Sequence, residues 1–190
     1  MQREIALREW AVAVDALESG RQIIVLRKGG IAEETKEFRL ESPRFYLFPS
    51  YEHQRPELVK PESREGIDAS IAEAEAHPGA VRIASYAEVE EDIEVTDAGT
   101  LSRLGDLHIW TEEYAEERLK WKRTKPLHVL VLRMYRLEEP VLVPMKTSYG
   151  GCKSWLRFED PVPELRGIPV LDEETFEERK TAVKRAIQGF

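Results

Sequence analysis

Two spacings of apolar residues recur along the chain and predict a mixture of helices and strands. Over residues 5–19 the apolar positions lie three or four apart, which is typical of an amphipathic helix, and Gly20 stands where that helix would end. Residues 22–28 and 45–48 are short, nearly unbroken apolar runs, whereas residues 38–41 alternate between apolar and charged. These three segments predict strands.

A less hydrophobic stretch follows. Residues 50–79 contain spaced prolines and predict a surface insertion with one helix over residues 66–76. Over residues 81–95 the apolar side chains fall on odd positions, which predicts a strand with a break near Glu90. The alternative for this segment is a helix, because Ser85 begins a capping-box pattern.

The last part of the chain returns to strands. A short helix is predicted to begin at Asp97 or Thr100 and to run through Leu104, and Thr111 is placed to cap another. Residues 127–137 form the strongest strand candidate, and prolines confine the next strand to residues 141–143. Residues 153–158 alternate again, which predicts a closing strand.

A final helix is predicted over residues 172–188, with glutamates in its first turns and basic residues in its last, as the helix dipole favours. Neither a repeat nor a linker interrupts the sequence, so residues 1–190 are predicted to form a single α+β domain. We expect a mixed or antiparallel β-sheet, or a partly closed barrel, flanked by helices.

Composition narrows the class of protein. Hydrophobic residues make up 42% of the chain and charged residues 34%, which is ordinary for a globular domain. The net charge of −8 arises in residues 61–111, which hold 3 basic and 12 acidic side chains. This balance argues against nonspecific nucleic-acid binding but leaves room for a local basic groove. Abundant glutamate and arginine without asparagine are typical of a thermophile or of a G+C-rich genome.

Several features bear on location. No apolar run approaches the roughly 18 residues that span a bilayer, and the N-terminus leads into an amphipathic stretch rather than into the apolar core of a signal peptide. A single cysteine excludes an internal disulfide framework. We therefore expect a cytoplasmic protein that does not enter a membrane.

The loop 149–155 is the most prominent candidate for a working surface, because it combines two glycines with a lysine and a tryptophan. We predict that its ligand-binding residues are Tyr149, Gly150, Gly151, Lys153 and Trp155. The adjacent Cys152 is interpreted as a small packed side chain rather than a nucleophile.

A second candidate lies at the end of the first predicted strand. Arg27 and Lys28 precede Gly29 and Gly30, and two cations beside exposed backbone amides can hold a phosphate or carboxylate. The alternative is a solvated strand end followed by a glycine turn.

Four further residues extend the predicted site. His53 and Gln54 follow a buried strand and offer donors and acceptors to a base edge, unless their role is structural. Trp110 precedes a helix that ends in a dense basic run, a combination typical of nucleic-acid contacts, with core packing as the alternative. Arg133 lies in an apolar strand, where it needs a buried carboxylate or an anionic ligand.

Carboxylates suggest a different chemistry. Glu34 or Glu41 can hold Mg²⁺ in a metal-dependent phosphodiesterase, with Lys153 stabilising the phosphate. The alternative is that these glutamates are ordinary solvated surface residues. The leading hypothesis, which is given below, requires no cofactor. A third possibility is a protein-interaction module that uses the acidic residues 61–111.

Five segments carry a family resemblance. In chain order they are Arg27–Ile31, Tyr51–Gln54, His108–Trp110, Pro126–Arg133 and Tyr149–Trp155. Through them the chain resembles a bacterial family of uncharacterised proteins, the domain of unknown function 1802. Some members are associated with restriction-endonuclease-like domains, so the resemblance implies a role in restriction–modification or nucleic-acid handling. The succession of strands is also similar to small PUA-like barrels, which bind RNA or modified bases.

The leading hypothesis is a domain that binds nucleic acid or a nucleotide-like ligand. Cations would contact phosphate, Trp110 or Trp155 would stack on a base, and His53 and Gln54 would read its edge. The predicted residues should then converge on one cavity. The sequence assigns neither a catalytic activity nor an oligomeric state.

Overall fold

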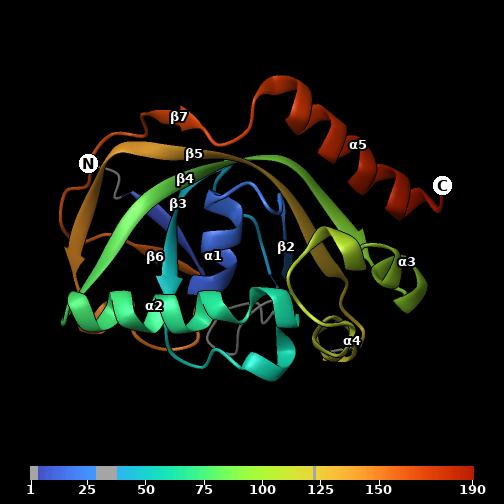
Figure 1. The fold of residues 1–190 in the computed structure, drawn as a ribbon, viewed down its shortest axis with the longest axis horizontal. Coiled ribbons are helices and arrows are strands. Elements are labelled where there is room, and N and C mark those ends of the chain that lie inside the picture. The colour runs from blue at the N-terminus through green and yellow to red at the C-terminus, as the bar shows by residue number, and fades with distance from the viewer. Residues whose placement is uncertain (1–3, 29–37, 122) are drawn as a thin grey trace.

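A mixed sheet organises the molecule (Figure 1). The computed structural model describes residues 4–28, 38–121 and 123–190. Its strands are β1 (Ile5–Trp10), β2 (Ile24–Arg27), β3 (Arg44–Ser50), β4 (Ala80–Val95), β5 (Leu127–Pro144), β6 (Trp155–Arg157) and β7 (Gly167–Pro169). In the described part of the chain they form one seven-stranded sheet in the order β2-β5-β4-β3-β1-β6, with β7 paired to β5. The predicted α+β class is confirmed, and the sheet is open rather than closed into a barrel.

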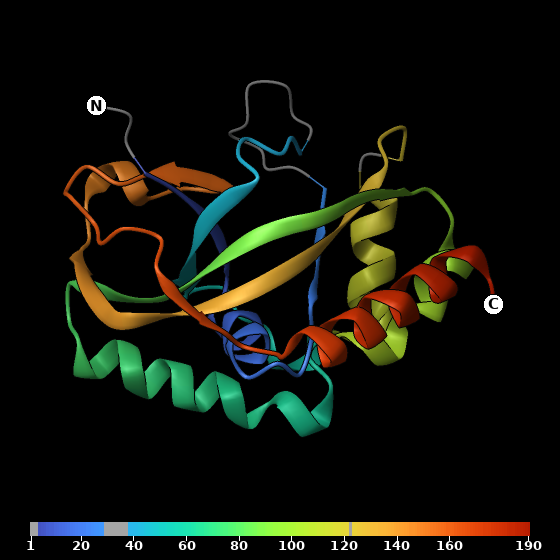
Figure 2. The same cartoon turned by 90° about the horizontal axis from the view of Figure 1, so that it is seen from above.

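Helices pack around this sheet. They are α1 (Ala11–Glu18), α2 (Glu65–Ala76), α3 (Ala98–Arg103), α4 (Glu112–Lys120) and α5 (Glu173–Gln188). Helix α1 lies against the sheet, and α2 lies outside α1 (Figure 2). Helix α5 runs beside α3 (Figure 1). Asp97, Thr111 and Asp172 cap α3, α4 and α5 through their side-chain oxygens, as their positions in the sequence predict.

The longest ladder joins β4 and β5. The two strands pair antiparallel along most of their length, and the register shifts between Ile83 and Ser85 and again between Val89 and Glu91. The predicted strand with a break near Glu90 is therefore confirmed, and the capping-box alternative at Ser85 is wrong. The separate strand predicted at 141–143 is also wrong, because β5 continues through Pro140 as one element.

The prediction of a helix over residues 5–19 is wrong in its first part. Ile5–Trp10 forms β1, which pairs parallel to β3 and antiparallel to β6, and the helix begins only at Ala11. Side chains of β1 alternate between two hydrophobic clusters: Leu7 joins the larger, and Ala6 joins the smaller on the other face. Burial on both faces between two strands overrides the helical spacing of this segment.

Smaller differences concern residues 38–41, strand β7 and the predicted surface insertion. The predicted strand at 38–41 is absent, and Phe38 is instead buried from a loop. Strand β7 has no alternating pattern and is held by the close approach of Gly167 to β5, where an added Cβ would lie 2.2 Å from the carbonyl oxygen of Arg136. Within the predicted surface insertion, α2 is present, but Leu58 and Val59 are buried.

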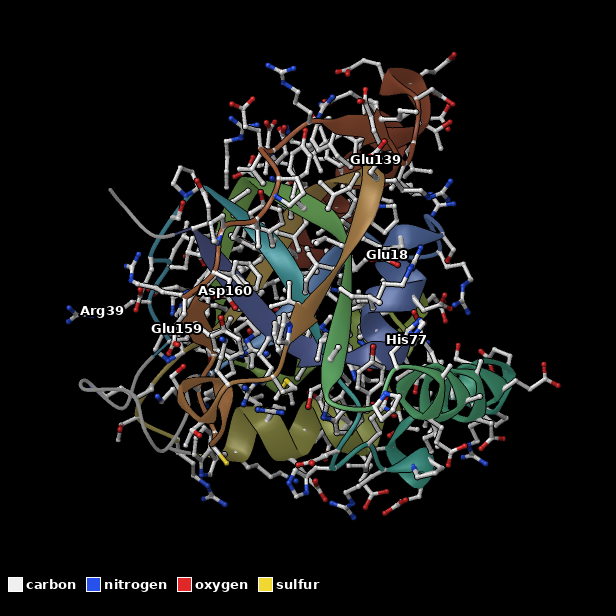
Figure 3. All side chains as sticks on the ribbon, turned by 90° about the vertical axis from the view of Figure 1, so that its left-hand side faces the viewer. Glu18, Arg39, His77, Glu139, Glu159 and Asp160 are labelled. Atoms are coloured by element: carbon white, nitrogen blue, oxygen red, sulfur yellow. The ribbon has the colours of Figure 1, made fainter. Side chains whose placement is uncertain are left out.

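Part of the acidic segment pairs with basic side chains outside it. Carboxylates of β4 pair with basic groups on β3, β5 and α5: Glu88 with Arg44, Glu90 with Arg133 and Lys180, Glu91 with Lys184. Other charged side chains, such as Arg39, Glu139 and Glu159, project outward over the surface (Figure 3). Among the helices in the described ranges, none is long and apolar enough to span a bilayer.

Candidate functional site

One cleft collects positive charge in this acidic chain. It lies where the ends of β1 and β2 meet α4, the turn after β3 and the loop before β6. We call it the cationic cleft, and its lining residues are Arg8, Glu9, Trp10, Arg27, Ser50, Glu52, His53, Arg118, Gly151, Cys152, Lys153 and Ser154. Its volume of about 210 Å³ is below the roughly 300–1,000 Å³ of pockets for drug-sized ligands.

Arg27 is the best-anchored cation in the cleft. Its Nη1 lies 3.2 Å from Oε2 of Glu9, and its Nη2 donates to Oγ of Ser154 at 2.6 Å. Glu9 is only 4% exposed and also accepts from the backbone N–H of Trp10 at 2.8 Å. The Nε of Arg27 has no hydrogen-bond partner within the described residues. The guanidinium is therefore held in place while one donor remains unused.

Arg8 and Arg118 flank this pair. Arg8 lies over the ring of Phe48 at 5.7 Å and donates to the carbonyl of Gly151. Burial lowers the pKa of Arg8, against the opposing influence of Cys152 and Glu52. The pKa shift means that the charged form of Arg8 lacks part of its solvation, which a bound anion would restore. Arg118 lies over the ring of Tyr114 at 5.1 Å.

The charges in the cleft do not cancel. Four basic side chains, those of Arg8, Arg27, Arg118 and Lys153, face two carboxylates, those of Glu9 and Glu52. Lys153 is exposed, and its ammonium makes a long contact of 3.5 Å with the carbonyl of Ser148. The cleft thus carries a local surplus of two positive charges although the whole chain has a net charge of −8.

The rim combines unusual backbone with an aromatic face. His53 has a φ of 65°, the only positive value among the described residues other than glycine, and its side chain is exposed. Gly151 has a φ of 86° on the facing loop. The positive φ of His53, unlike that of a glycine, is strained, and strained backbone often occurs at ligand-binding sites. Trp10 is half-buried, lines the cleft and contacts the ring of Tyr114 at 5.4 Å.

The structure brings together four of the predicted residues, namely Arg27, His53, Gly151 and Lys153. Gly29, Gly30 and Glu34 lie outside the described residues. Gly150 adjoins the cleft without lining it. The prediction that Cys152 is packed is wrong, because its side chain is exposed in the cleft.

Lys28 does not share a site with Arg27. It is 1% exposed, and its ammonium donates to the carbonyl of Leu119 in the last turn of α4. Burial lowers the pKa of Lys28. Because successive side chains of a strand point to opposite faces, the two adjacent cations reach different environments. Lys28 therefore stabilises the C-terminal end of a helix.

Gln54 holds the start of α1 rather than facing the cleft. Its Oε1 accepts from the backbone N–H of Val12 at 2.9 Å, and its Nε2 donates to Oγ of Ser70 at 2.9 Å. These bonds satisfy one of the free N–H groups at the helix N-terminus and link α1 to α2. The prediction that Gln54 reads a base edge together with His53 is not supported by this geometry.

Three predicted aromatic residues belong to the core. Trp110 is fully buried and stacks on Tyr114 at 5.1 Å. Trp155 is 8% exposed and donates from Nε1 to the carbonyl of Arg39 at 2.7 Å. Tyr149 is buried, and its hydroxyl accepts from the backbone N–H of Glu159 at 2.8 Å. None of the three lines the cationic cleft, so their predicted convergence with Arg27 is wrong.

Arg133 forms the structural ion-pair cluster that the sequence left as an alternative. It contacts Glu90 at 3.1 Å and also Glu173 and Glu177 of α5, and it lies 4.3 Å from the ring of Phe176. Hydrogen bonding to Glu173, with further help from Glu90, raises its pKa. Arg133 therefore ties α5 to the sheet, away from the cleft.

Of the two carboxylates proposed for Mg²⁺, only Glu41 lies among the described residues. Glu41 pairs with Arg157 at 3.3 Å and does not line the cationic cleft. Among the described residues, no group of three or more His, Cys, Asp or Glu side chains is arranged to hold a metal ion. With Glu34 outside those residues, the magnesium alternative stays a prediction.

Sequence reasoning missed Arg8, Glu9 and Trp10 because it assigned them to a helix. The only signal that could have indicated them is the succession of an arginine, a glutamate and a tryptophan at the end of a strand. Arg118 was visible as part of a basic run, but the position of that run beside β1 was not. Ser154 gave no signal of its own.

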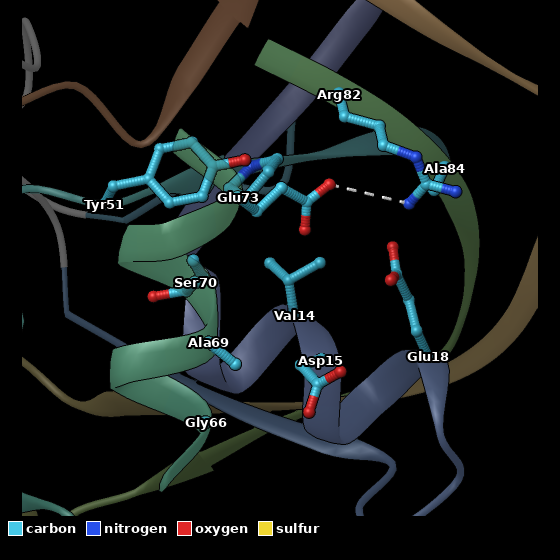
Figure 4. A pocket seen from close by; sticks show the side chains of 12 residues that line it. Val14, Asp15, Glu18, Tyr51, Gly66, Ala69, Ser70, Glu73, Arg82 and Ala84 are labelled. Atoms are coloured by element: carbon cyan, nitrogen blue, oxygen red, sulfur yellow. Dashed lines mark ion pairs between the residues drawn. The ribbon is translucent and has the colours of Figure 1, made fainter. Parts of the chain in front are cut away.

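A second hollow lies between α1, α2 and β4, and we call it the acidic hollow (Figure 4). Its lining residues are Ala11, Val14, Asp15, Glu18, Pro49, Tyr51, Gly66, Ala69, Ser70, Glu73, Arg82 and Ala84. Arg82 lies 3.8 Å from Glu73 and is the only cation of the lining. Burial raises the pKa of Glu18, and it raises the pKa of Tyr51 to about 12.

Comparison with known proteins gives a family and distant structural neighbours. The family model described as domain of unknown function (DUF1802) matches residues 6–182. No curated protein matches the chain. A crystal structure of ASCH from Zymomonas mobilis has a TM-score of 0.46 at 15% identity, covering 95% of this chain and 94% of that one. A ZmASCH mutant from the same organism has a TM-score of 0.47 at 15% identity, covering 94% and 95%. Similarity this distant does not carry a function across, and the predicted likeness to PUA-like barrels stays a prediction.

Proposed function

This chain belongs to the DUF1802 family, and we propose that its cationic cleft binds the phosphate of a nucleotide or of single-stranded nucleic acid. The observation that carries the proposal is the surplus of cations in the cleft, with Arg8, Arg27, Arg118 and Lys153 converging in a strongly acidic protein. The negative net charge disfavours nonspecific binding of polyanions, so a local group of cations favours binding at this one place.

The roles within the cleft follow from how each cation is held. Arg27 is fixed by Glu9, Ser154 and the carbonyl of Arg8, so its guanidinium holds a positive charge in one place and orientation beside a bound phosphate. Lys153 is exposed on the loop and acts as a point charge that can follow the ligand. Because the cleft is small, we expect it to hold one phosphate group at a time.

Trp10 takes the stacking role that the sequence assigned to Trp110 or Trp155. It is half-buried in the cleft lining, beside the cations, whereas the other two are core residues. Stacking of a base on an aromatic ring does not depend on base identity. In this arrangement the arginines bind a phosphate while the attached base stacks on Trp10. We therefore expect binding with little sequence preference.

Fluorescence anisotropy with labelled oligonucleotides tests this proposal. An eight-nucleotide RNA, the matching single-stranded DNA and the same DNA with a modified cytosine are titrated at several salt concentrations. We expect affinity to fall with salt, with a slope of about −0.7 for each phosphate neutralised on a single strand. Lys153→Ala should weaken binding and reduce that slope. Lys146→Ala is the matched control, since Lys146 pairs with Asp160 and does not line the cleft.

The same mixtures separate the rival functions. Cleavage that requires Mg²⁺ or Mn²⁺, stops with EDTA and is lost in Glu41→Ala would replace binding with the phosphodiesterase alternative. Absence of both binding and cleavage, or equal effects of Lys153→Ala and Lys146→Ala, would contradict the cleft as the site. The interaction-module hypothesis would then be the one to pursue.

A further inference from the structure

A separate pocket lies between α3, α4 and the short turn Gly105–Leu107, away from the cationic cleft. Its volume is about 240 Å³, well above the roughly 10–15 Å³ that one water molecule needs. We call it the His108–Trp110 pocket. Lys60, His108 and Trp110 contact one another on one side of its lining, which we call its inner part.

Two ring nitrogens beside this pocket lack hydrogen-bond partners. His108 is 5% exposed and Trp110 is fully buried, and neither Nε2 of His108 nor Nε1 of Trp110 has a partner within the described residues. Buried polar atoms are nearly always satisfied, so two such atoms on residues that line one pocket require an explanation. A ligand that supplied acceptors would recover the free energy that their desolvation costs.

Both nitrogens are donors. The backbone N–H of Trp110 donates to Nδ1 of His108 at 3.2 Å, which places the proton of the neutral ring on Nε2. Burial and then the nearby Lys60 lower the pKa of His108 to about 4, so the ring is neutral at pH 7. The indole nitrogen of Trp110 can only donate. The inner part of the pocket therefore presents donors, which suit a ligand with acceptor atoms.

Lys60 adds a cation at the same end. Its ammonium donates to the carbonyl of His108 at 2.8 Å and also to the carbonyl of Gly105. An ammonium has three N–H donors, so one remains for a ligand. The inner part of the pocket thus combines a positive charge with neutral donors, which suits a carboxylate or carbonyl oxygen.

The outer part has the opposite character. Asp106, Glu112 and Glu116 line it, and the first two are exposed while Glu116 is half-buried. Glu112 accepts from Ser102 at 3.1 Å, and Glu116 pairs with Lys120 at 3.1 Å. With Lys60 as the one cation in the lining, its formal charge is −2. A simple anion is disfavoured by this charge, and a simple cation finds no acceptors at the inner wall.

We propose that the His108–Trp110 pocket binds a small dipolar ligand of the amino-acid type. Its carboxylate or carbonyl oxygen accepts from His108 and Trp110, and its ammonium faces Glu112 and Glu116. This site is independent of the phosphate-binding role of the cationic cleft, so the failure of either proposal leaves the other intact.

NMR of the tryptophan indole N–H groups tests the proposal directly. The chain has 4 tryptophans, and the signal of Trp110 is assigned with Trp110→Phe, or by substituting the other three in turn if that variant does not fold. The probes are glycine, β-alanine and 4-aminobutanoate, with acetate and ethylamine as the two separated halves. We expect at least one amino acid to shift the Trp110 signal saturably, at a concentration about tenfold lower than either half requires.

Charge-neutral variants at the outer part of the pocket give the second readout. The double variant Glu112→Gln, Glu116→Gln should weaken the best amino acid about tenfold, whereas Glu113→Gln, an exposed neighbour outside the pocket, should not change it. An unshifted Trp110 signal with all three amino acids would mean that the pocket holds only water and would overturn the proposal. Equal binding of acetate, or an unchanged affinity in the double variant, would overturn it too.

Discussion

The cationic cleft and the acidic hollow are built from consecutive residues yet have opposite charge. Arg8, Glu9 and Trp10, at the end of β1, line the cleft, and the helix that begins at the next residue gives Asp15 and Glu18 to the hollow. In the cleft the cations outnumber the carboxylates by two, and in the hollow three carboxylates face one arginine. The change from strand to helix therefore separates the two environments. The net charge of the whole chain does not indicate the local charge of either one.

The two regions also differ in how firmly their charges are held. In the cleft the Arg27–Glu9 pair is 3.2 Å long, with 12% and 3% of the two side chains exposed. In the hollow the Arg82–Glu73 pair is 3.8 Å long, with 40% of each exposed (Figure 4). A desolvated pair keeps its geometry and costs much to break, whereas an exposed pair contributes little. The cleft is thus the more pre-organised of the two.

The largest expected effect is on stability. Arg27→Met leaves the carboxylate of Glu9 buried without its partner, so the free energy of unfolding should fall by about 3–5 kcal/mol. In the hollow, Arg82→Met should cost less than about 1 kcal/mol because its pair is exposed. Urea unfolding of both variants measures the difference.

A double variant provides the control for this comparison. Glu9→Gln combined with Arg27→Met removes the uncompensated charge and should recover a large part of the loss. Equal destabilisation by Arg27→Met and Arg82→Met would mean that the pair in the cleft is no better held than the pair in the hollow.

The next largest effect concerns Trp10. Stacking of one base on an aromatic ring contributes about 1–3 kcal/mol, so Trp10→Leu should weaken single-stranded RNA binding by roughly 5- to 150-fold. The anisotropy titration described above measures it. Tyr51→Leu, in the hollow, is the matched aromatic control and should leave RNA affinity unchanged. A loss of affinity in that control alone would move the binding site to the hollow.

Charge substitutions in the two regions should have smaller and unequal effects. Lys153→Glu places an acid in the cleft and should weaken RNA binding about tenfold, which corresponds to about 1.4 kcal/mol. Glu73→Lys adds a cation to the acidic hollow but supplies no anchored arginine or stacking ring, so we expect no gain in affinity. Tight RNA binding by Glu73→Lys would show that positive charge alone is sufficient. The pre-organisation of the cleft would then not be needed to explain binding.

The smallest expected effect is a pH-dependent gain in stability when the buried carboxyl of Glu18 in the acidic hollow is replaced. Burial raises the pKa of Glu18, against the hydrogen bond from Ser85. The folded state therefore binds this proton more tightly than the unfolded chain, and stability is lost as pH rises from about 4.5 through the higher folded pKa. Glu18→Gln removes this loss, so it should raise the urea midpoint at pH 7 and not at pH 4.

Asp15→Asn is the control for Glu18. Asp15 lines the same hollow, but its side chain is 60% exposed and it pairs with Arg21 at the surface. Its substitution should leave the urea midpoint nearly unchanged at both pH values. A lower midpoint for Glu18→Gln at pH 7 would mean that the Ser85 hydrogen bond outweighs the cost of burying the charge.

The sequence predicted elements wherever local pattern and tertiary environment agree. Period-two alternation gave β4 with its break, and capping residues gave α3, α4 and α5. It failed at β1, where residues that favour a helix are captured between two strands. It also failed for the continuous β5, because Pro140 lies in the register shift opposite Ile83–Ser85, where the ladder is irregular and a proline is tolerated.

The candidate site was predicted in part for the same reason. Arg27, His53, Gly151 and Lys153 stand at strand ends and loops, where sequence context indicates exposure, and they do line one cleft. Lys28, Gln54 and Trp110 have the same chemistry in the sequence, but each uses it internally: Lys28 on a helix end, Gln54 on α1, Trp110 in the core. Only their partners distinguish them from ligand-binding groups, and those partners are distant in sequence.

By itself, the sequence determined the α+β class, most of the elements and the position of the loop 149–155, because these depend on local spacing and capping. The tertiary structure alone decided which cations face solvent together. Pairing of β1 between β3 and β6 places Arg8, Glu9 and Trp10 beside that loop. The net charge of a segment is the sum of its residues, but the field in a cleft depends on distances that only the folded chain fixes.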